Sequence, residues 1–130
     1  MSKMRILGFV TRWKKLDKPF FTTFRYPRKD KDWLVGEKVQ IVINPRSKKK
    51  LWLGVAKILS IEKRNIGFKE MEGMKSLTDA EAKNDGFRSK EYMITWMFNL
   101  YGERIVNEPM NKLLFKWVER KPEEDILTEI

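Results

Sequence analysis

The sequence predicts an α+β fold, a small curled sheet or β-barrel of about five or six strands with two or three flanking helices. Three observations support this fold. Short segments with strand character fill the first half of the chain, a capped helical stretch interrupts them, and another strand-like segment follows it. The 130 residues match the length of one domain. We expect a single domain over residues 1–121 and an acidic C-terminal tail over residues 122–130.

Four strands are predicted in the first half of the chain. Segments that are rich in aromatic and β-branched residues, or in which apolar and polar residues alternate, are typical of strands. Gly54 interrupts the longest of these segments and indicates a β-bulge, which is common where a sheet curls. The four predicted strands are Arg5–Val10, Phe20–Arg25, Glu37–Ile43 and Leu51–Lys63.

Two helices and a last strand are predicted in the second half. Thr78 and Glu81 form a capping box, and Asn84-Asp85-Gly86 is a typical helix end. Ser89 caps a second helix that extends to about Leu100. Its apolar stripe is expected to pack in the core and consists of Tyr92, Trp96 and Leu100, with Met93 and Met97 beside them. Alternation from Leu113 to Arg120 predicts the last strand.

The composition excludes several kinds of chemistry. The chain has no cysteine, so it forms no disulfide, thiolate metal site or cysteine nucleophile. It also has no histidine, which excludes imidazole catalysis and histidine metal ligands. We expect no metal and no cofactor. The 35% of charged residues, together with the absent cysteine, fits a heat-adapted protein.

Positive charge is concentrated in the first half of the chain. Residues 1–64 contain 18 Lys and Arg against 5 Asp and Glu, a net charge of +13, whereas the remaining residues carry −3. Such asymmetry favours a polyanion-binding face, and its alternative is a basic protein that is merely soluble. No apolar run approaches the length of a membrane span. We therefore expect a cytoplasmic protein without membrane contact.

Thr23 and Arg25 are the first candidate binding residues. On a strand, two residues separated by one position point to the same face, where a hydroxyl and a guanidinium can hold a phosphate or a base edge. Three cations in the following loop, Arg28, Lys29 and Lys31, would extend the positive surface. Alternatively, Arg25 pairs with a carboxylate and the strand has only a structural role.

Lys48, Lys49 and Lys50 precede Leu51-Trp52 and form the second candidate site. Cations beside an exposed aromatic ring suit a single strand of nucleic acid, because the ring stacks on a base and the cations hold phosphates. The alternative is a solvated hairpin tip with Trp52 turned into the core. Because the basic segments are strands and loops, RNA is expected rather than the major groove of duplex DNA.

Three segments together resemble the ASCH domain family of the PUA-like superfamily over roughly residues 3–120. They are LDKPFFTTFR with VGEKV after it, VAKILSIEKR, and LTDAEAKNDGF followed by a helix and Leu100-Tyr101-Gly102. The resemblance implies a PUA-like β-barrel with helices beside it and a cleft between them. It also implies RNA binding, in RNA metabolism or translation. Some small bacterial members resemble enzymes, either ribonucleases or amidohydrolases acting on acetylated cytidine nucleosides.

The cleft motif of that family, GxKxxTxR, is only partly present. Thr23 and Arg25 match its threonine and arginine, but Phe20 replaces its lysine and Lys18 its glycine. Asp85 occupies the place of the family's catalytic acid. The resemblance thus implies a binding module rather than an enzyme, with Phe20 available to stack on a base.

A hydrolase acting on RNA or on a modified nucleoside is the alternative function. In that case Lys18, Thr23 and Asp85 would be catalytic, with Tyr101 as a further proton donor.

Overall fold

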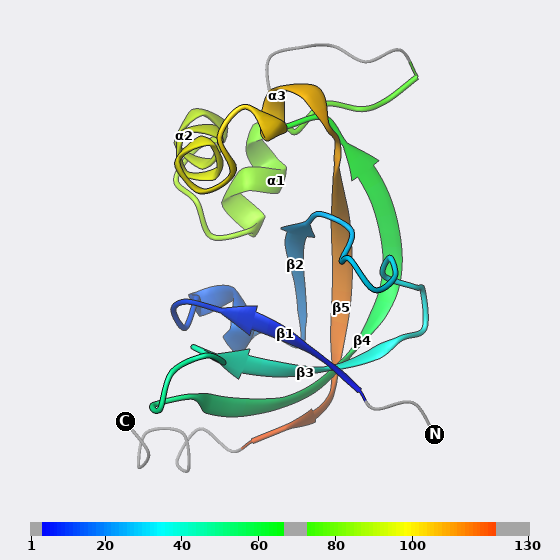
Figure 1. The fold of residues 1–130 in the computed structure, drawn as a ribbon, viewed down its shortest axis with the longest axis vertical. Helices are drawn as coiled ribbons and strands as arrows, with labels where there is room; N and C mark the ends of the chain where they lie inside the picture. Colours follow the sequence, from blue (N-terminus) through cyan, green and yellow to red (C-terminus); the bar gives the residue numbers. More distant parts are fainter. Residues whose placement is uncertain (1–3, 67–72, 122–130) are drawn as a thin grey trace.

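The computed structural model describes residues 4–66 and 73–121 of the 130. Its five strands form one mixed sheet in the order β1-β3-β4-β5-β2, and the three α-helices lie together at one end of it (Figure 1). The strands are β1 (Arg5–Phe9), β2 (Phe20–Arg25), β3 (Lys38–Ile43), β4 (Leu51–Arg64) and β5 (Met110–Arg120). The helices are the 3₁₀ turn η1 (Lys14–Asp17), α1 (Asp79–Asn84), α2 (Lys90–Tyr101) and α3 (Arg104–Asn107).

The predicted α+β class is confirmed, with five strands and three α-helices. β2 has the predicted bounds, and β1, β3 and β4 differ from the predicted strands by one residue at one end. β5 begins three residues earlier than predicted, since Met110 and Asn111 also pair with β4. The short helix α3 lies in a segment for which no element was predicted. The expected acidic tail, residues 122–130, lies outside the described residues.

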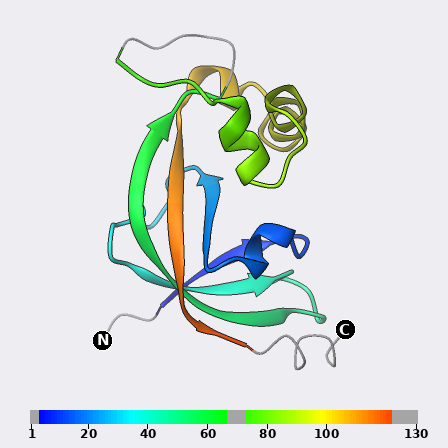
Figure 2. The same ribbon diagram turned by 180° about the vertical axis from the view of Figure 1, so that it is seen from behind.

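The sheet curls but stays open between its two edge strands. β1 pairs with β3 in parallel, and β2 pairs with β5 antiparallel. In the described part of the chain, no ladder joins β1 to β2. This open seam lies beneath the helices (Figures 1 and 2). The sheet is therefore barrel-like without being a closed barrel.

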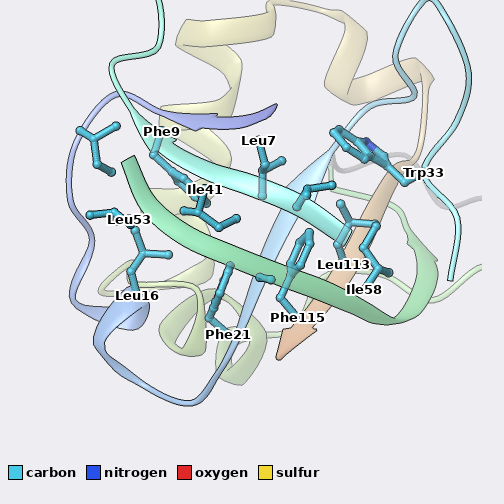
Figure 3. Close-up of a cluster of buried hydrophobic side chains, with 13 residues drawn as sticks. Leu7, Phe9, Leu16, Phe21, Trp33, Ile41, Leu53, Ile58, Leu113 and Phe115 are labelled. Atoms are coloured by element: carbon cyan, nitrogen blue, oxygen red, sulfur yellow. The ribbon is translucent and has the colours of Figure 1, made fainter. Parts of the chain in front are cut away.

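Two buried apolar clusters hold the molecule together, one on each face of β2. Phe21 belongs to the inner core inside the curl of the sheet (Figure 3), and Phe24 belongs to a helical core beneath α1 and α2. Successive strand residues point to opposite faces, so the short segment FFTTF contributes to both. In α2 the buried residues are Met93, Ile94 and Met97. The prediction that Tyr92 and Leu100 belong to the core is wrong, because both are about half exposed.

Gly54 forms the predicted bulge in β4. The register of β4 shifts against β3 and β5 on either side of it, and its φ of +148° is rarely adopted by other residues. A Cβ atom at Gly54 would lie 2.1 Å from the backbone oxygen of Glu119. The close approach of β4 and β5 at the curl thus requires glycine.

We predict that Gly54→Ala lowers the free energy of unfolding by more than about 3 kcal/mol, since it combines a backbone clash with an unfavourable φ. Gly36→Ala is the matched control. Gly36 also has a positive φ, of +89°, but no atom lies within 4 Å of its added Cβ. Its expected cost is only about 1–2 kcal/mol. Urea denaturation followed by circular dichroism measures both, and equal costs would contradict the close approach as the reason for glycine.

Candidate functional site: a cleft at the open seam of the sheet

A cavity of about 100 Å³, the seam pocket, lies between the ends of β1 and β2 and the helices. The end of β1 contributes Gly8 and Phe9, and β2 contributes Thr23 and Arg25. Lys15 of η1 and Asp85, the residue that ends α1, form another part of its lining. α2 closes the pocket with Trp96, Met97, Leu100 and Tyr101. Segments distant in sequence thus meet where the two edge strands fail to pair.

A buried ion pair lies in the wall of the seam pocket. The Lys15 ammonium lies 3.0 Å from Oδ1 of Asp85, and both side chains are only 4% exposed. Thr22 Oγ1 donates a weaker hydrogen bond of 3.3 Å to the same oxygen. Burial lowers the pKa of Lys15 and raises the pKa of Asp85, and the attraction between the two charges opposes both shifts. The site therefore holds a lysine that releases its proton more readily than an exposed one.

Arg25 bridges the seam. Its Nη2 donates a 2.8 Å hydrogen bond to the backbone oxygen of Gly8 on β1, and its Nε donates a 3.4 Å bond to Thr23 Oγ1. Its guanidinium also lies 4.8 Å from the centre of the Phe9 ring. Burial lowers the pKa of Arg25, although Tyr101 and Asp85 oppose this shift.

The seam pocket contains more positive than negative charge. No carboxylate of the described residues lies within 4 Å of the Arg25 guanidinium, and Asp85 already pairs with Lys15. The alternative that Arg25 pairs with a carboxylate is therefore not what the structure shows. A half-buried cation with no carboxylate of the described residues within ion-pair distance favours an anionic ligand.

Aromatic rings form part of the lining of the seam pocket. The Trp13 ring lies 5.2 Å from Phe87 and 6.0 Å from Trp96, centre to centre. Gly86 makes this packing possible, because its φ is +110° and an added Cβ would lie 3.0 Å from Trp13. The Asp-Gly-Phe segment thus has three roles: the acid pairs with Lys15, the glycine admits Trp13, and Phe87 completes the wall.

An open groove of about 560 Å³ continues from the seam pocket and shares Gly8, Arg25 and Tyr101 with it. Arg28 and Arg46 supply further positive charge, and Tyr26 and Trp33 supply aromatic surface. Burial raises the pKa of Tyr26 to about 12, so its hydroxyl stays protonated at neutral pH. A hollow of about 770 Å³ beside Val10 is lined by Lys48, Lys49 and Lys50. Cations therefore border a continuous surface that crosses the end of β1.

The structure brings some of the predicted site residues together and separates others. Thr23, Arg25 and Asp85 meet in the seam pocket, Arg28 lies in the adjoining groove, and Lys48–Lys50 line the neighbouring hollow. Lys29 and Lys31 are exposed on the loop between β2 and β3. Trp52 is half-buried on β4.

Lys18 and Phe20, by contrast, do not line the seam pocket. Lys18 is exposed beyond η1, and Phe20 is 48% exposed with the Lys116 ammonium 5.9 Å from its ring centre. The lysine of the site is Lys15 instead. No sequence pattern distinguished Lys15 from its neighbours Lys14 and Lys18, because a 3₁₀ turn of four residues has too little periodicity to reveal its buried side.

Comparison with protein-family models, with curated proteins and with solved structures finds no match to this chain. The resemblance to the ASCH family therefore stays a prediction from the quoted motifs. In the described part of the chain, no helix has the length and apolar character needed to cross a membrane.

We predict that the Lys15–Asp85 pair makes the two substitutions strongly non-additive. Lys15→Met leaves a buried carboxylate without its cation, and Asp85→Asn leaves a buried ammonium. Each should lower the free energy of unfolding by about 3–5 kcal/mol. The double variant buries neither uncompensated charge and should be about 0.5–3 kcal/mol more stable than the sum of the single effects. Chemical denaturation of the four proteins measures this difference, and simple additivity would show that the pair does not form.

Proposed function

We propose that this protein is an RNA-binding module of the ASCH type, in which the seam pocket receives one nucleotide. The observation that supports this most directly is Arg25, a half-buried cation with no carboxylate partner among the described residues, where a narrow pocket opens into a wider basic groove. A phosphate at this position would accept charge-assisted hydrogen bonds in a poorly solvated site.

The aromatic wall gives the proposed nucleotide a place for its base. The rings of Trp13, Phe87 and Trp96 line the same pocket as Thr23, whose hydroxyl can bond the polar edge of a base. Stacking of a base on an aromatic side chain contributes about 1–3 kcal/mol and suits an unpaired base, such as one in a single strand or a loop.

The basic surface beyond the pocket is suited to the neighbouring nucleotides. Arg28 and Arg46 border the groove, and Lys48–Lys50 border the hollow beside Val10. Release of counterions from an RNA strand on this surface would supply affinity. This surface contains many of the cations that give residues 1–64 their net charge of +13.

We predict that Arg25→Gln weakens RNA binding by about 1.5–3 kcal/mol, through loss of a charge-assisted contact. Arg88→Gln is the matched control, because it removes the same charge from an exposed residue that contacts Tyr92 instead of the pocket. Fluorescence anisotropy with a short oligouridylate measures both. If about four to six phosphates are neutralised, the log–log slope with salt is about −3 to −4. Equal affinities of the two variants would contradict the proposal.

A hydrolase is the second candidate function, and the position of Lys15 favours it. Phe20 stands where the motif has a lysine, but another lysine is present in the pocket. Lys15 lines it together with Thr23 and Asp85. A lysine with a lowered pKa beside a carboxylate and a hydroxyl can transfer protons during hydrolysis of an amide or of a phosphodiester. In this function Lys15 takes the role that the sequence assigned to Lys18.

Two variants distinguish a catalytic pocket from a binding pocket. If the protein hydrolyses N4-acetylcytidine or cleaves RNA, Thr23→Val abolishes turnover, and the rate rises with pH through a lysine pKa below its ordinary value of 10.5. Lys18→Gln is the control and leaves the rate unchanged, because Lys18 is exposed outside the pocket. Chromatography of the products measures turnover. A wild-type protein that binds RNA without turnover would leave binding as the function.

A further inference from the structure

Three lysines lie side by side across the sheet, on the face opposite the inner core. Lys38 of β3 pairs directly with Lys57 of β4, and Lys57 pairs directly with Lys116 of β5. Directly paired residues of antiparallel strands point to the same face at a spacing of about 5 Å. Phe20 of β2 is the next residue in the row, as the partner of Lys116. We call these three lysines the outer lysine row.

The outer lysine row is exposed and has no acidic partner. All three lysines are exposed, and in the described part of the chain no carboxylate lies within 4 Å of their ammonium groups. The same face is covered by helices only at its other end, where Phe24 and Met110 enter the helical core. At the row itself, Phe20 is 48% exposed and Val118 is 52% exposed.

This arrangement does not stabilise the fold. Like charges directly opposite each other on neighbouring strands are destabilising, and here two such pairs are adjacent. Some other surface cations have acidic neighbours, as Arg12 has Asp17 and Lys83 has Asp79. A ligand that supplies a row of negative charges would remove the repulsion, and the exposed ring beside the row adds a surface on which a base can stack.

We propose that the outer lysine row is a second RNA-binding surface, at which three lysines contact neighbouring phosphates of a single strand and Phe20 stacks on one of its bases. This surface is separate from the seam pocket, whose lining includes none of these four residues. It depends on the proposed function only in that the ligand is RNA. A long strand can occupy both surfaces, whereas a trinucleotide can fill the seam pocket but has too few phosphates to contact all three lysines.

The test uses a row variant, Lys38→Gln/Lys57→Gln/Lys116→Gln. Its control removes the same number of charges elsewhere and is Lys75→Gln/Lys83→Gln/Lys90→Gln. Of these control residues, Lys75 precedes α1, Lys83 lies in α1, and Lys90 begins α2. The probes are oligouridylates of three and of about 20 nucleotides, the longer exceeding most single-domain sites. The row variant should bind the long probe roughly tenfold or more weakly at 0.1 M salt, with a log–log salt slope shallower by about 2. Its affinity for the trinucleotide should match that of the control.

Phe20→Ala should weaken binding of the long probe by roughly fivefold or more, while Phe98→Ala, an equally exposed phenylalanine on α2, should leave it unchanged. The row variant should also melt at a higher temperature than the wild type, because it lacks the like-charge pairs. Equal effects of row and control variants on the long probe would overturn the proposal. The proposal would also be overturned if the row variant lost binding to anionic phosphatidylserine vesicles while its affinity for RNA stayed unchanged.

The two RNA surfaces fail in distinguishable ways. If the seam pocket is not an RNA site, Arg25→Gln leaves the affinity for the long probe unchanged, whereas the row variant still loses affinity for it. If the outer lysine row is not an RNA site, Arg25→Gln lowers the affinity for both probes, and the row variant binds them with the same affinity as its control.

Discussion

A buried ion pair, Lys15 to Asp85, joins two segments that lie 70 residues apart in the chain. Lys15 belongs to the short turn between the two edge strands, and Asp85 ends the first helix. Their contact holds the helices against the open seam of the sheet and thereby shapes the pocket. Because both charges are removed from water, each is tolerated only in the presence of the other. The pocket therefore exists only when strand, turn and helix are all in place.

The open seam is the second feature that allows a site here. A closed barrel would satisfy the edges of β1 and β2 by pairing them, and the space between them would be lost. In this protein a side chain makes the connection instead, since Arg25 reaches from β2 to the backbone oxygen of Gly8 on β1. The same guanidinium is then available to a ligand. The incomplete sheet is what places a cation, a hydroxyl and an ion pair around one cavity.

Positive charge is distributed over two separate parts of the surface. One part follows the seam pocket and its groove to the turn between β3 and β4, and contains Arg25, Arg28 and Lys48–Lys50. The other is the outer lysine row, produced by the register of four strands. A net charge counted along the sequence cannot separate the two, because residues of both parts alternate along the chain. If RNA is the ligand, as we propose, two such surfaces on one small domain would let a single strand make more contacts than one cleft permits.

Local sequence determined much of the fold by itself. Alternation and β-branched content fixed the position of β2 and nearly all of β1, β3 and β4, and the capping box at Thr78 and Glu81 forms as the residue types require. Gly54 indicated its bulge, and Thr23, Arg25 and Asp85 were predicted as candidate site residues, which the structure brings together in one pocket. Only the tertiary structure decided that Lys15 and not Lys18 reaches the pocket, that the sheet stays open, and that three lysines align across β3, β4 and β5. Each of these depends on contacts between residues distant in sequence, which local periodicity does not encode.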